Sequence, residues 1–477
     1  MLTQTANRDS RLSFWLRVRE FAVPPSMIET ATARRHVGDW AGACAAAGID
    51  VDLHPRSVAR THGPELAKHI RADLRHLAPD LLRWHMPRIA PDGLLRPGLT
   101  LSLARYDAAG RDGASPVHLV VRTAPAWADA GQRISLALWD GSRSEGGACR
   151  HPHPRPSRRF RLDLHRHLWD VRRTDELRHR SGADLPAGDD GPVPDRDLPG
   201  TVPPGRRCAV DRWAAEARIL LHAEGRSESE RSVVVRLGGR HRLVLDLASD
   251  GDGDGDGDGG CAGPPSLRIA LKPAGGGTSA LSVLPDAATW VPPDLELIRT
   301  GAIEVDRLHP LVASALVPDH SPAASPRPPD PAGQPRPVEC RGARHRIGLV
   351  DGVLAPLDHD PDEIRREELL VALTGTPLPC LRAIDEAHRR PDCLTGVRER
   401  LDHGDIAGAL AVVEGLLGPG ALLRDGALRD ELEAAARRRI TYGLFRAGLV
   451  GPGPDRIRPG ESRPRAHRSH PRHTTAR

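Results

Sequence analysis

The spacing of apolar residues predicts helices in the first part of the chain. From residue 24 to residue 90, apolar positions recur at helical spacing, and several prolines stand where a new helix would begin. Ser26 and Glu29 have the spacing of a capping box, which favours a helix start at that point. We expect a helical domain over residues 24–90, preceded by a loose leader over residues 1–23. The expected helices cover residues 26–37, 40–47, 55–62, 64–77 and 79–86.

After residue 95 the period becomes two, which is the alternation of a strand with one buried face. Short alternating runs between turn-rich gaps predict an antiparallel meander. A helix pattern follows, with apolar residues from Leu164 to Leu177. We therefore expect a β meander plus a helix over residues 95–180. The expected strands cover residues 99–103, 117–121, 133–139 and 159–164.

A linker rich in Gly, Pro and Asp over residues 181–207 separates the meander from a second β region. A helix over residues 210–223 leads into two strands on either side of Gly238-Gly239, which is a two-residue hairpin signal. Further short strands follow, and two helices are expected to close this second sheet. The pattern predicts a helix plus β-hairpin region over residues 208–317.

The segment 318–337 contains eight prolines and is the clearest domain boundary in the chain. Beyond it, two strand patterns flank an Asp-Gly turn signal at residues 351–352, and a run of helix patterns follows. We expect a β-hairpin and a C-terminal helical domain over residues 338–450, and a disordered basic tail over residues 451–477. The whole pattern predicts an α+β fold with an N-terminal helical domain, central antiparallel β-hairpin and meander regions with helices, and a C-terminal helical domain.

Two turns far apart in the chain share a sequence. In each, Gly-Asp stands between two helical patterns, and small residues follow where two helices could approach closely; the segments are His36–Ala45 and His403–Ala411. They resemble the helical hairpins of tetratricopeptide repeats, which act as interaction modules. The period of about 34 residues typical of such repeats is absent. The alternative interpretation is an ordinary short helical hairpin.

The net charge of +5 is carried by the C-terminal tail, because residues 451–477 hold seven arginines and two acidic residues. The rest of the chain is neutral. Binding to nucleic acid requires a concentrated basic face. We therefore expect nucleic acid to associate with this protein only weakly, and only through residues 451–477.

Seven scattered cysteines, none of them in a Cys-x-x-Cys pair, favour a reducing, cytoplasmic environment over a disulfide framework. The N-terminus has no secretory signal pattern, because Arg17 and Arg19 interrupt its apolar run. No stretch of about 18 consecutive apolar residues occurs, so we expect no membrane span.

The densest group of candidate metal ligands lies between residues 149 and 170. Thiolates and imidazoles are the ligands that zinc prefers, and a turn could bring three or four of them together. His165 and His167 also partly match the His-x-His-x-Asp-His motif of metallo-β-lactamase-like hydrolases, but Trp169 stands where that motif has Asp. The alternative is an exposed basic loop. The candidate ligands are Cys149, His151, His153, His165 and His167.

Two other motifs lack the residues that would complete them. Ile384–His388 matches the magnesium motif of DEAH-type helicases, but neither Lys68 nor Lys272 belongs to a phosphate-binding loop, which excludes a P-loop ATPase. Asp250–Asp258 alternates with glycine as in a calcium-binding loop, but the bidentate Glu of that loop is missing.

These observations lead to a non-enzymatic cytoplasmic interaction or adaptor protein as the first hypothesis, with a protein as its partner. The alternative is a metal-dependent hydrolase that uses the Cys/His cluster over residues 149–170. A third hypothesis is association with nucleic acid through the tail. No cofactor is expected unless zinc occupies that cluster.

Overall fold

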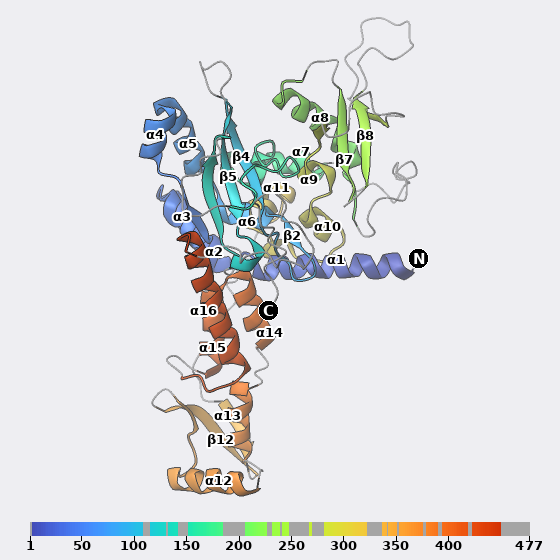
Figure 1. Ribbon diagram of the computed structural model, residues 1–477. Coiled ribbons are helices and arrows are strands. Elements are labelled where there is room, and N and C mark those ends of the chain that lie inside the picture. Colours follow the sequence, from blue (N-terminus) through green and yellow to red (C-terminus); the bar gives the residue numbers. More distant parts are fainter. Residues whose placement is uncertain are drawn as a thin grey trace, which may run out of the picture. The chain divides into compact units, whose positions relative to one another are not determined.

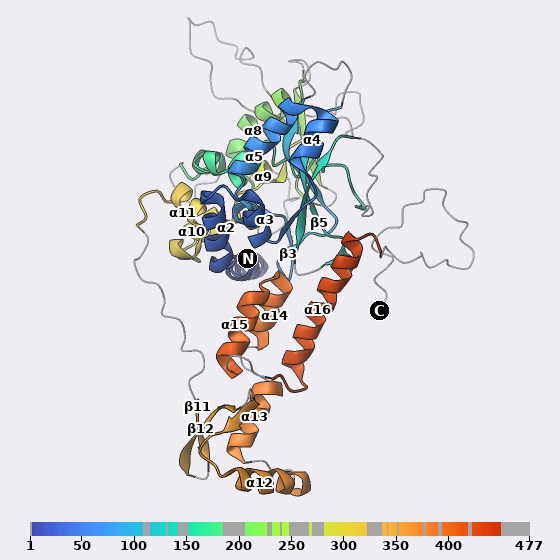
Figure 2. The ribbon, with the colours of Figure 1, turned by 90° about the vertical axis from the view of Figure 1, so that its left-hand side faces the viewer.

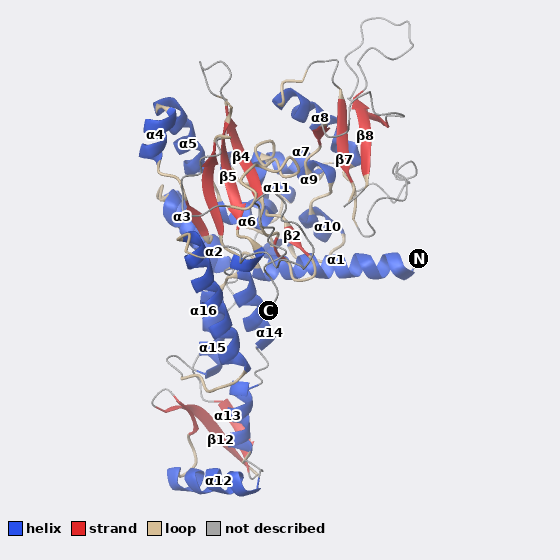
Figure 3. Ribbon diagram, viewed as in Figure 1, coloured by secondary structure: helices blue, strands red, loops and turns tan. Residues whose placement is uncertain are grey.

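The described residues combine helices with four small sheets, which confirms the predicted mixed α+β fold (Figure 3). The computed structural model describes residues 2–107, 115–129, 132–141, 151–184, 206–226, 231–238, 241–247, 267–269, 281–321, 336–340, 342–350, 353–374, 378–389, 394–417 and 422–449. Several predictions from the sequence fall outside these ranges. They concern the acidic repeat at residues 250–258, most of the linkers 181–207 and 318–337, and the tail 451–477.

The chain divides into two units. The first contains residues 1–125 and 134–322, and the second contains residues 126–133 and 323–477. The division at residue 322 falls inside the predicted proline-rich segment. The helical domain and the two β regions that we expected as separate parts before residue 317 all belong to the first unit.

The predicted helices of residues 24–90 all form. They are α2 (Pro25–His36), α3 (Trp40–Ala46), α4 (Pro55–His62), α5 (Pro64–His76) and α6 (Pro79–His85). The predicted capping box is wrong, because α2 begins at Pro25 and no side chain caps it. Proline has no N–H to satisfy and its φ suits the first helical position, so the helix starts one residue before Ser26.

The loose leader predicted for residues 1–23 is also wrong, because α1 (Leu2–Phe21) is a helix (Figure 1). Val18 is buried in the main core, next to the end of this helix. Arg19 is buried as well, and its guanidinium pairs with Asp294, with 2.7 Å between Nε and Oδ1. The segment is ordered by these long-range contacts, which its local apolar pattern does not reveal.

The first sheet has the order β1-β6-β5-β4. Strands β4 (Thr100–Tyr106), β5 (Val117–Thr123) and β6 (Ile134–Trp139) form the predicted antiparallel meander. The unexpected strand is β1 (Ile49–Val51), which pairs parallel with β6. Because β1 comes from the helical region, residues 24–90 and the meander share one sheet and one core, and they are not separate domains.

Other short elements complete this part of the unit. A two-stranded hairpin is formed by β2 (Arg88–Ile89) and β3 (Leu94–Leu95). The strand predicted for residues 159–164 reduces to a single bridge between Ser102 and Arg161. The predicted helix after it is broken into η2 (Arg166–Leu168), η3 (Val171–Arg173) and α7 (Glu176–Ser181).

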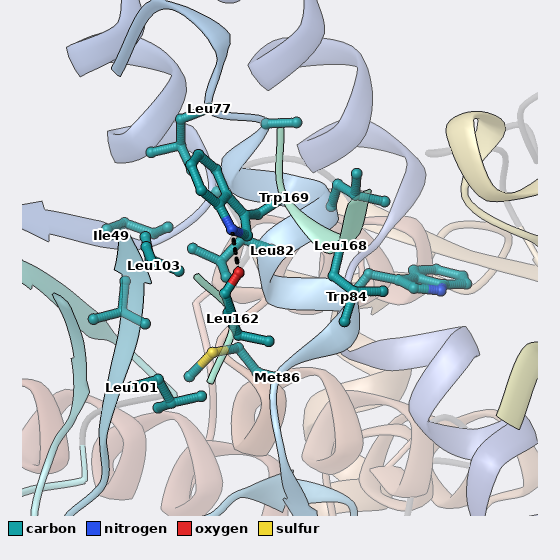
Figure 4. Packing of buried hydrophobic residues seen from close by; sticks show 14 of the residues in the cluster. Ile49, Leu77, Leu82, Trp84, Met86, Leu101, Leu103, Leu162, Leu168 and Trp169 are labelled. Atoms are coloured by element: carbon teal, nitrogen blue, oxygen red, sulfur yellow. Dashed lines mark hydrogen bonds between the residues drawn. The ribbon is translucent and has the colours of Figure 1, made fainter. Parts of the chain in front are cut away.

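The break in that helix has a cause in the core. Trp169 is fully buried, and its indole N–H donates to the backbone carbonyl of Leu162, with 3.0 Å between Nε1 and O (Figure 4). The Asp170 carboxylate accepts from the N–H of Arg172 and so starts a new turn at that point. Leu77, Leu82, Trp84 and Met86 from the helical region lie in the same cluster.

The second sheet of this unit has the order β10-β7-β8-β9, and its antiparallel β7–β8 pair is the predicted hairpin. Trp213, Val233 and Trp290 belong to its small core. The helices α10 (Pro293–Arg299) and α11 (Pro310–Leu316) do not close this sheet as expected, because their apolar residues are buried in the main core. The elements around the sheet are α8 (Val210–Ala223), β7 (Ser232–Arg236), β8 (Arg242–Leu247), β9 (Leu267–Ile269), β10 (Ser282–Val283) and α9 (Asp286–Thr289).

The second unit contains a three-stranded antiparallel sheet and helices. The predicted hairpin is formed by β12 (Ala343–Val350) and β13 (Val353–Pro356). An edge strand, β11 (Arg336–Cys340), is added by residues of which the first two lie in the segment expected as a linker. Three helices lie alongside one another, α14 (Leu394–His403), α15 (Ile406–Leu417) and α16 (Ala427–Arg446) (Figure 2). Before them come α12 (Pro361–Thr374) and α13 (Pro379–Arg389), so the match to the helicase motif lies in a helix.

No helix within the described ranges is both long enough and apolar enough to cross a membrane.

Candidate functional site

The histidines predicted as metal ligands are mostly buried, and His151 makes contacts within the first unit. Its Nε2 lies 3.0 Å from the carbonyl oxygen of Thr123, and its Nδ1 accepts from the backbone N–H of His153 at 3.2 Å. Burial lowers the pKa of His151 to about 4. These contacts hold His151 as a neutral side chain that joins the segment after residue 150 to the end of β5.

His165 and His167 lie side by side, with 5.7 Å between their ring centres. His165 Nε2 is 3.2 Å from a carboxylate oxygen of Glu216, which also accepts from Arg180. Burial alone would raise the pKa of Glu216, but its contacts with His165 and Arg180 outweigh burial and lower it to about 2. Glu216 thus lies between His165 and Arg180 in a buried network of polar contacts.

The four described histidines of the predicted cluster do not provide three donor atoms within 4.8 Å of one another. Cys149 lies outside the described residues. The metal site and the hydrolase activity predicted for residues 149–170 therefore stay predictions.

A different group of zinc-type ligands is brought together in the second unit. Cys340 ends β11, His359 lies in the loop between β13 and α12, and Cys380 is the second residue of α13. Their ligand atoms all lie within 4.8 Å of one another, and within the described ranges this is the one group of three or more candidate ligands that meets this limit. The Sγ of Cys380 is 3.5 Å from Nε2 of His359.

The group is enclosed by the protein. Cys340 and Cys380 are both 0% exposed, and the side chain of His359 is 4% exposed. Both cysteines are free thiols. Burial raises the pKa of Cys380 to about 11, and the neighbouring Cys340 thiol acts in the same direction.

The loop that carries His359 is fixed on both sides. Asp358 accepts from the backbone N–H and from the guanidinium of Arg346 on β12, each at 2.7 Å. The hydrogen bonds from Arg346 lower the pKa of Asp358 to about 2. Asp360 accepts from the N–H of Asp362 and so caps α12. These contacts on either side hold the His359 imidazole next to the two thiols.

The environment of His359 includes two further side chains. Nδ1 of His359, the ring nitrogen that does not face Cys380, is 3.6 Å from a carboxylate oxygen of Glu363. The ring of His345 stacks on that of His359 at a centroid distance of 4.1 Å, with 11° between the ring planes. The imidazole is thus held by a carboxylate at its edge and by a ring on its face.

Sequence reasoning missed this group because its members are far apart in the chain. Cys340 and Cys380 are 40 residues apart, with no Cys-x-x-Cys spacing to mark either one. His359 stands in Asp358-His359-Asp360, which the adjacent helix cap explains without any metal. Only the pairing of β11 with β12 and the packing of α13 bring the three together.

The two Gly-Asp turns that share a sequence also share their hydrogen bonds. Asp39 caps α3 by accepting from Gly42 N–H at 2.8 Å, and Asp405 caps α15 by accepting from Gly408 N–H at 2.9 Å. In each turn the same aspartate pairs with an arginine five residues earlier, Arg34 in the first and Arg400 in the second. The glycine before each aspartate has a positive φ, which ends the preceding helix.

No protein family, curated protein or solved structure matches the chain. The functional assignment therefore rests on the contacts described above.

Proposed function

We propose that the protein is a non-enzymatic interaction protein whose second unit binds an apolar segment of a partner protein through α12. One observation carries the proposal: three leucines on this helix are exposed to solvent. Leu369 is 68% exposed, Leu370 is 47% exposed and Leu373 is 84% exposed. Scattered exposed leucines are ordinary on protein surfaces, but a cluster on one element is typical of an interaction site.

The three leucines lie on one face of the helix. Positions i, i+1 and i+4 fall within about 100° of the helix circumference. The same solvent face carries Arg365 and Arg366 one turn earlier, and both are exposed. On this face Arg365 pairs with the exposed carboxylate of Asp362 at 3.9 Å, so Arg366 is the arginine that stands next to the leucines.

The position of Arg366 beside the leucines argues against a second copy of the chain as the occupant. In a parallel pair of α12 helices, Arg366 would face Arg366, and like charges would repel. In an antiparallel pair, the leucines of one helix would face the arginines of the other. A partner segment with apolar side chains and a nearby acidic side chain fits the leucines and Arg366.

The shared Gly-Asp turns support the same proposal. They resemble the turns of tetratricopeptide-type helical hairpins, and one of them joins α14 to α15 in the second unit. The cytoplasmic location and the weak association of the tail with nucleic acid stay predictions from the sequence.

The test uses a photo-crosslinking residue placed at Leu373 of the full chain in cells of the source organism. The matched control places the same residue at Ile440 on α16, which is also apolar and is 63% exposed. We expect a discrete crosslinked protein from Leu373 and none of that size from Ile440. Equal products from both positions, or none from either, would contradict the proposal.

The crosslinked partner is then purified and its affinity for the full chain is measured. Because burying a leucine stabilises a complex by about 1.5–3 kcal/mol, we expect Leu373→Glu to weaken binding at least tenfold. Ile440→Glu adds the same charge elsewhere and should leave the affinity unchanged. Arg366→Glu should lower the association rate. If the crosslinked partner is a second copy of this chain, the proposal of an acidic, apolar partner is wrong.

A further inference from the structure

The distance between Cys380 and His359 matches that between two ligands of one zinc ion, and Cys340 lies close enough to both to join them. With Zn–S of about 2.3 Å and Zn–N of about 2.0–2.1 Å, tetrahedral angles place S and N about 3.6 Å apart and the two S atoms about 3.8 Å apart. The observed distance from Cys380 Sγ to His359 Nε2 is 3.5 Å, and all three ligand atoms lie within 4.8 Å. The three side chains are therefore already spaced for coordination.

Glu363 provides an independent indication. Zinc-bound histidines commonly direct their second ring nitrogen at a carboxylate, which fixes the tautomer and orients the ring. In this protein Nε2 of His359 faces the thiols, while Nδ1 lies 3.6 Å from Glu363. The carboxylate stands where it would hold the imidazole ready to bind a metal through Nε2.

The net charge of the ligands and the metal is compatible with a buried site. Two thiolates and one Zn²⁺ ion sum to zero, so the complex avoids the large cost of burying an isolated charge. Sulfur and imidazole ligands in a tetrahedral arrangement select zinc over magnesium or calcium, which prefer oxygen.

We propose that Cys340, His359 and Cys380 bind one structural Zn²⁺ ion, with Glu363 orienting the histidine. The site joins the end of β11, the loop before α12 and the first turn of α13. His345 is not a ligand to the same ion, because a ring stacked in parallel at 4.1 Å does not direct its nitrogens into the plane of the His359 ring. The described residues supply three ligands, and because a structural zinc site is four-coordinate, one further ligand completes the tetrahedron.

The metal content of the full chain, purified without a histidine tag, tests the site by elemental mass spectrometry. We expect about one zinc per chain, lost in Cys340→Ser and in Cys380→Ser. Cys44→Ser is the matched control, because Cys44 is also buried and free but lies in the first unit. It should retain the zinc.

Two variants test the site without removing a ligand. Glu363→Gln should weaken zinc affinity by about 10–100-fold in a chelator competition, while the chain stays folded. Asp362→Asn is the control, because it removes a carboxylate from the same turn of α12 on the solvent side, where Asp362 is exposed. Its zinc affinity should equal that of the natural chain. Replacing zinc with cobalt should give the absorption of a tetrahedral site with thiolate ligands.

Several outcomes would overturn this site. A metal-free chain that takes up neither zinc nor cobalt would do so, as would a Cys340–Cys380 disulfide detected by mass spectrometry. Zinc that survives Cys340→Ser but is lost in Cys149→Ser would assign the metal to residues 149–170 instead. None of these results bears on the leucines of α12, so the interaction proposal is tested separately.

Discussion

Asp405 accepts a hydrogen bond from the backbone N–H of Gly408 at 2.9 Å, and its carboxylate fills the space that a side chain at residue 408 would need. A Cβ atom there would lie 2.1 Å from Oδ2 of Asp405. The cap and the glycine therefore depend on each other. The same relationship joins Asp39 to Gly42 in the first unit.

The first prediction follows from that dependence. Gly415 lies in the same helix with no atom within 4 Å of its Cβ position, so Gly415→Ala should stabilise α15 by up to about 1 kcal/mol. Gly408→Ala gains the same helix propensity but displaces the carboxylate of Asp405. Losing this N-cap costs about 0.5–2 kcal/mol of stability. Gly408→Ala should therefore be less stable than Gly415→Ala by about 1 kcal/mol. Hydrogen exchange of the α15 amides measures both.

A double-mutant cycle provides the control for this prediction. When Asp405 is replaced by Ala, the cap is already absent, and Gly408→Ala should become stabilising. If Gly408→Ala has the same effect with and without Asp405, the two residues are not coupled as described.

The second prediction concerns the buried ion pair of Arg19 and Asp294. Asp294 accepts from Arg19 at 2.7 and 2.9 Å and from the indole N–H of Trp84 at 3.1 Å. Asp294→Asn leaves a buried guanidinium without its counter-charge, which costs about 3–5 kcal/mol. Urea denaturation of the first unit measures the loss. Asp107→Asn removes the exposed partner of Arg105 and should change the stability by less than about 1 kcal/mol.

The third prediction is that the first unit loses stability between pH 6.5 and pH 4. Burial lowers the pKa of His85 and of His151 to about 4, whereas an unfolded histidine titrates near pH 6.5. In this window the unfolded chain binds more protons, so stability falls as the pH falls. Each residue contributes about 3 kcal/mol, present in full above pH 6.5 and lost at about pH 4.

The contribution of one histidine is isolated by His151→Asn. The difference in unfolding free energy between pH 7 and pH 4.5 should become smaller in this variant. An unchanged difference would show that folding does not lower the pKa of His151. Glu216 does not affect this comparison. Its pKa is lowered to about 2, so the stability that it contributes is lost only as the pH falls below 4.5.

The fourth prediction concerns zinc removal. Because metal binding contributes directly to folding, a chelator should speed amide exchange in β11 and α13, where Cys340 and Cys380 lie. The strands β4, β5 and β6 of the first unit should exchange at the same rate with and without the chelator. A uniform change in both units would contradict a local zinc site.

Local rules were sufficient for much of the secondary structure. The helices from α3 to α6 and the β4-β5-β6 meander follow from apolar periodicity, proline positions and turn residues, because these signals act within a few neighbouring residues. The Gly-Asp turns at Asp39 and Asp405 were recognised for the same reason, and the structure shows that both aspartates cap the following helix. The capping box at Ser26 failed because a proline one residue earlier provides a better helix start.

The candidate metal centre could not be predicted in this way. The densest run of histidines suggested residues 149–170, but buried histidines there contact Thr123 and Glu216. The ligand group that forms uses single residues from a strand end, a loop and a helix start. Proximity in the chain was therefore a poor guide to proximity in space.

The sequence by itself determined the mixed class of the fold, most helix positions and the neutrality of the chain outside its tail. The tertiary structure alone decided that α1 is ordered, that β1 joins the first sheet and that Cys340, His359 and Cys380 meet. The physical reason is the range of the forces involved. Hydrogen bonds within helices and turns join near neighbours, whereas strand pairing and the burial of apolar surface select partners from anywhere in the chain.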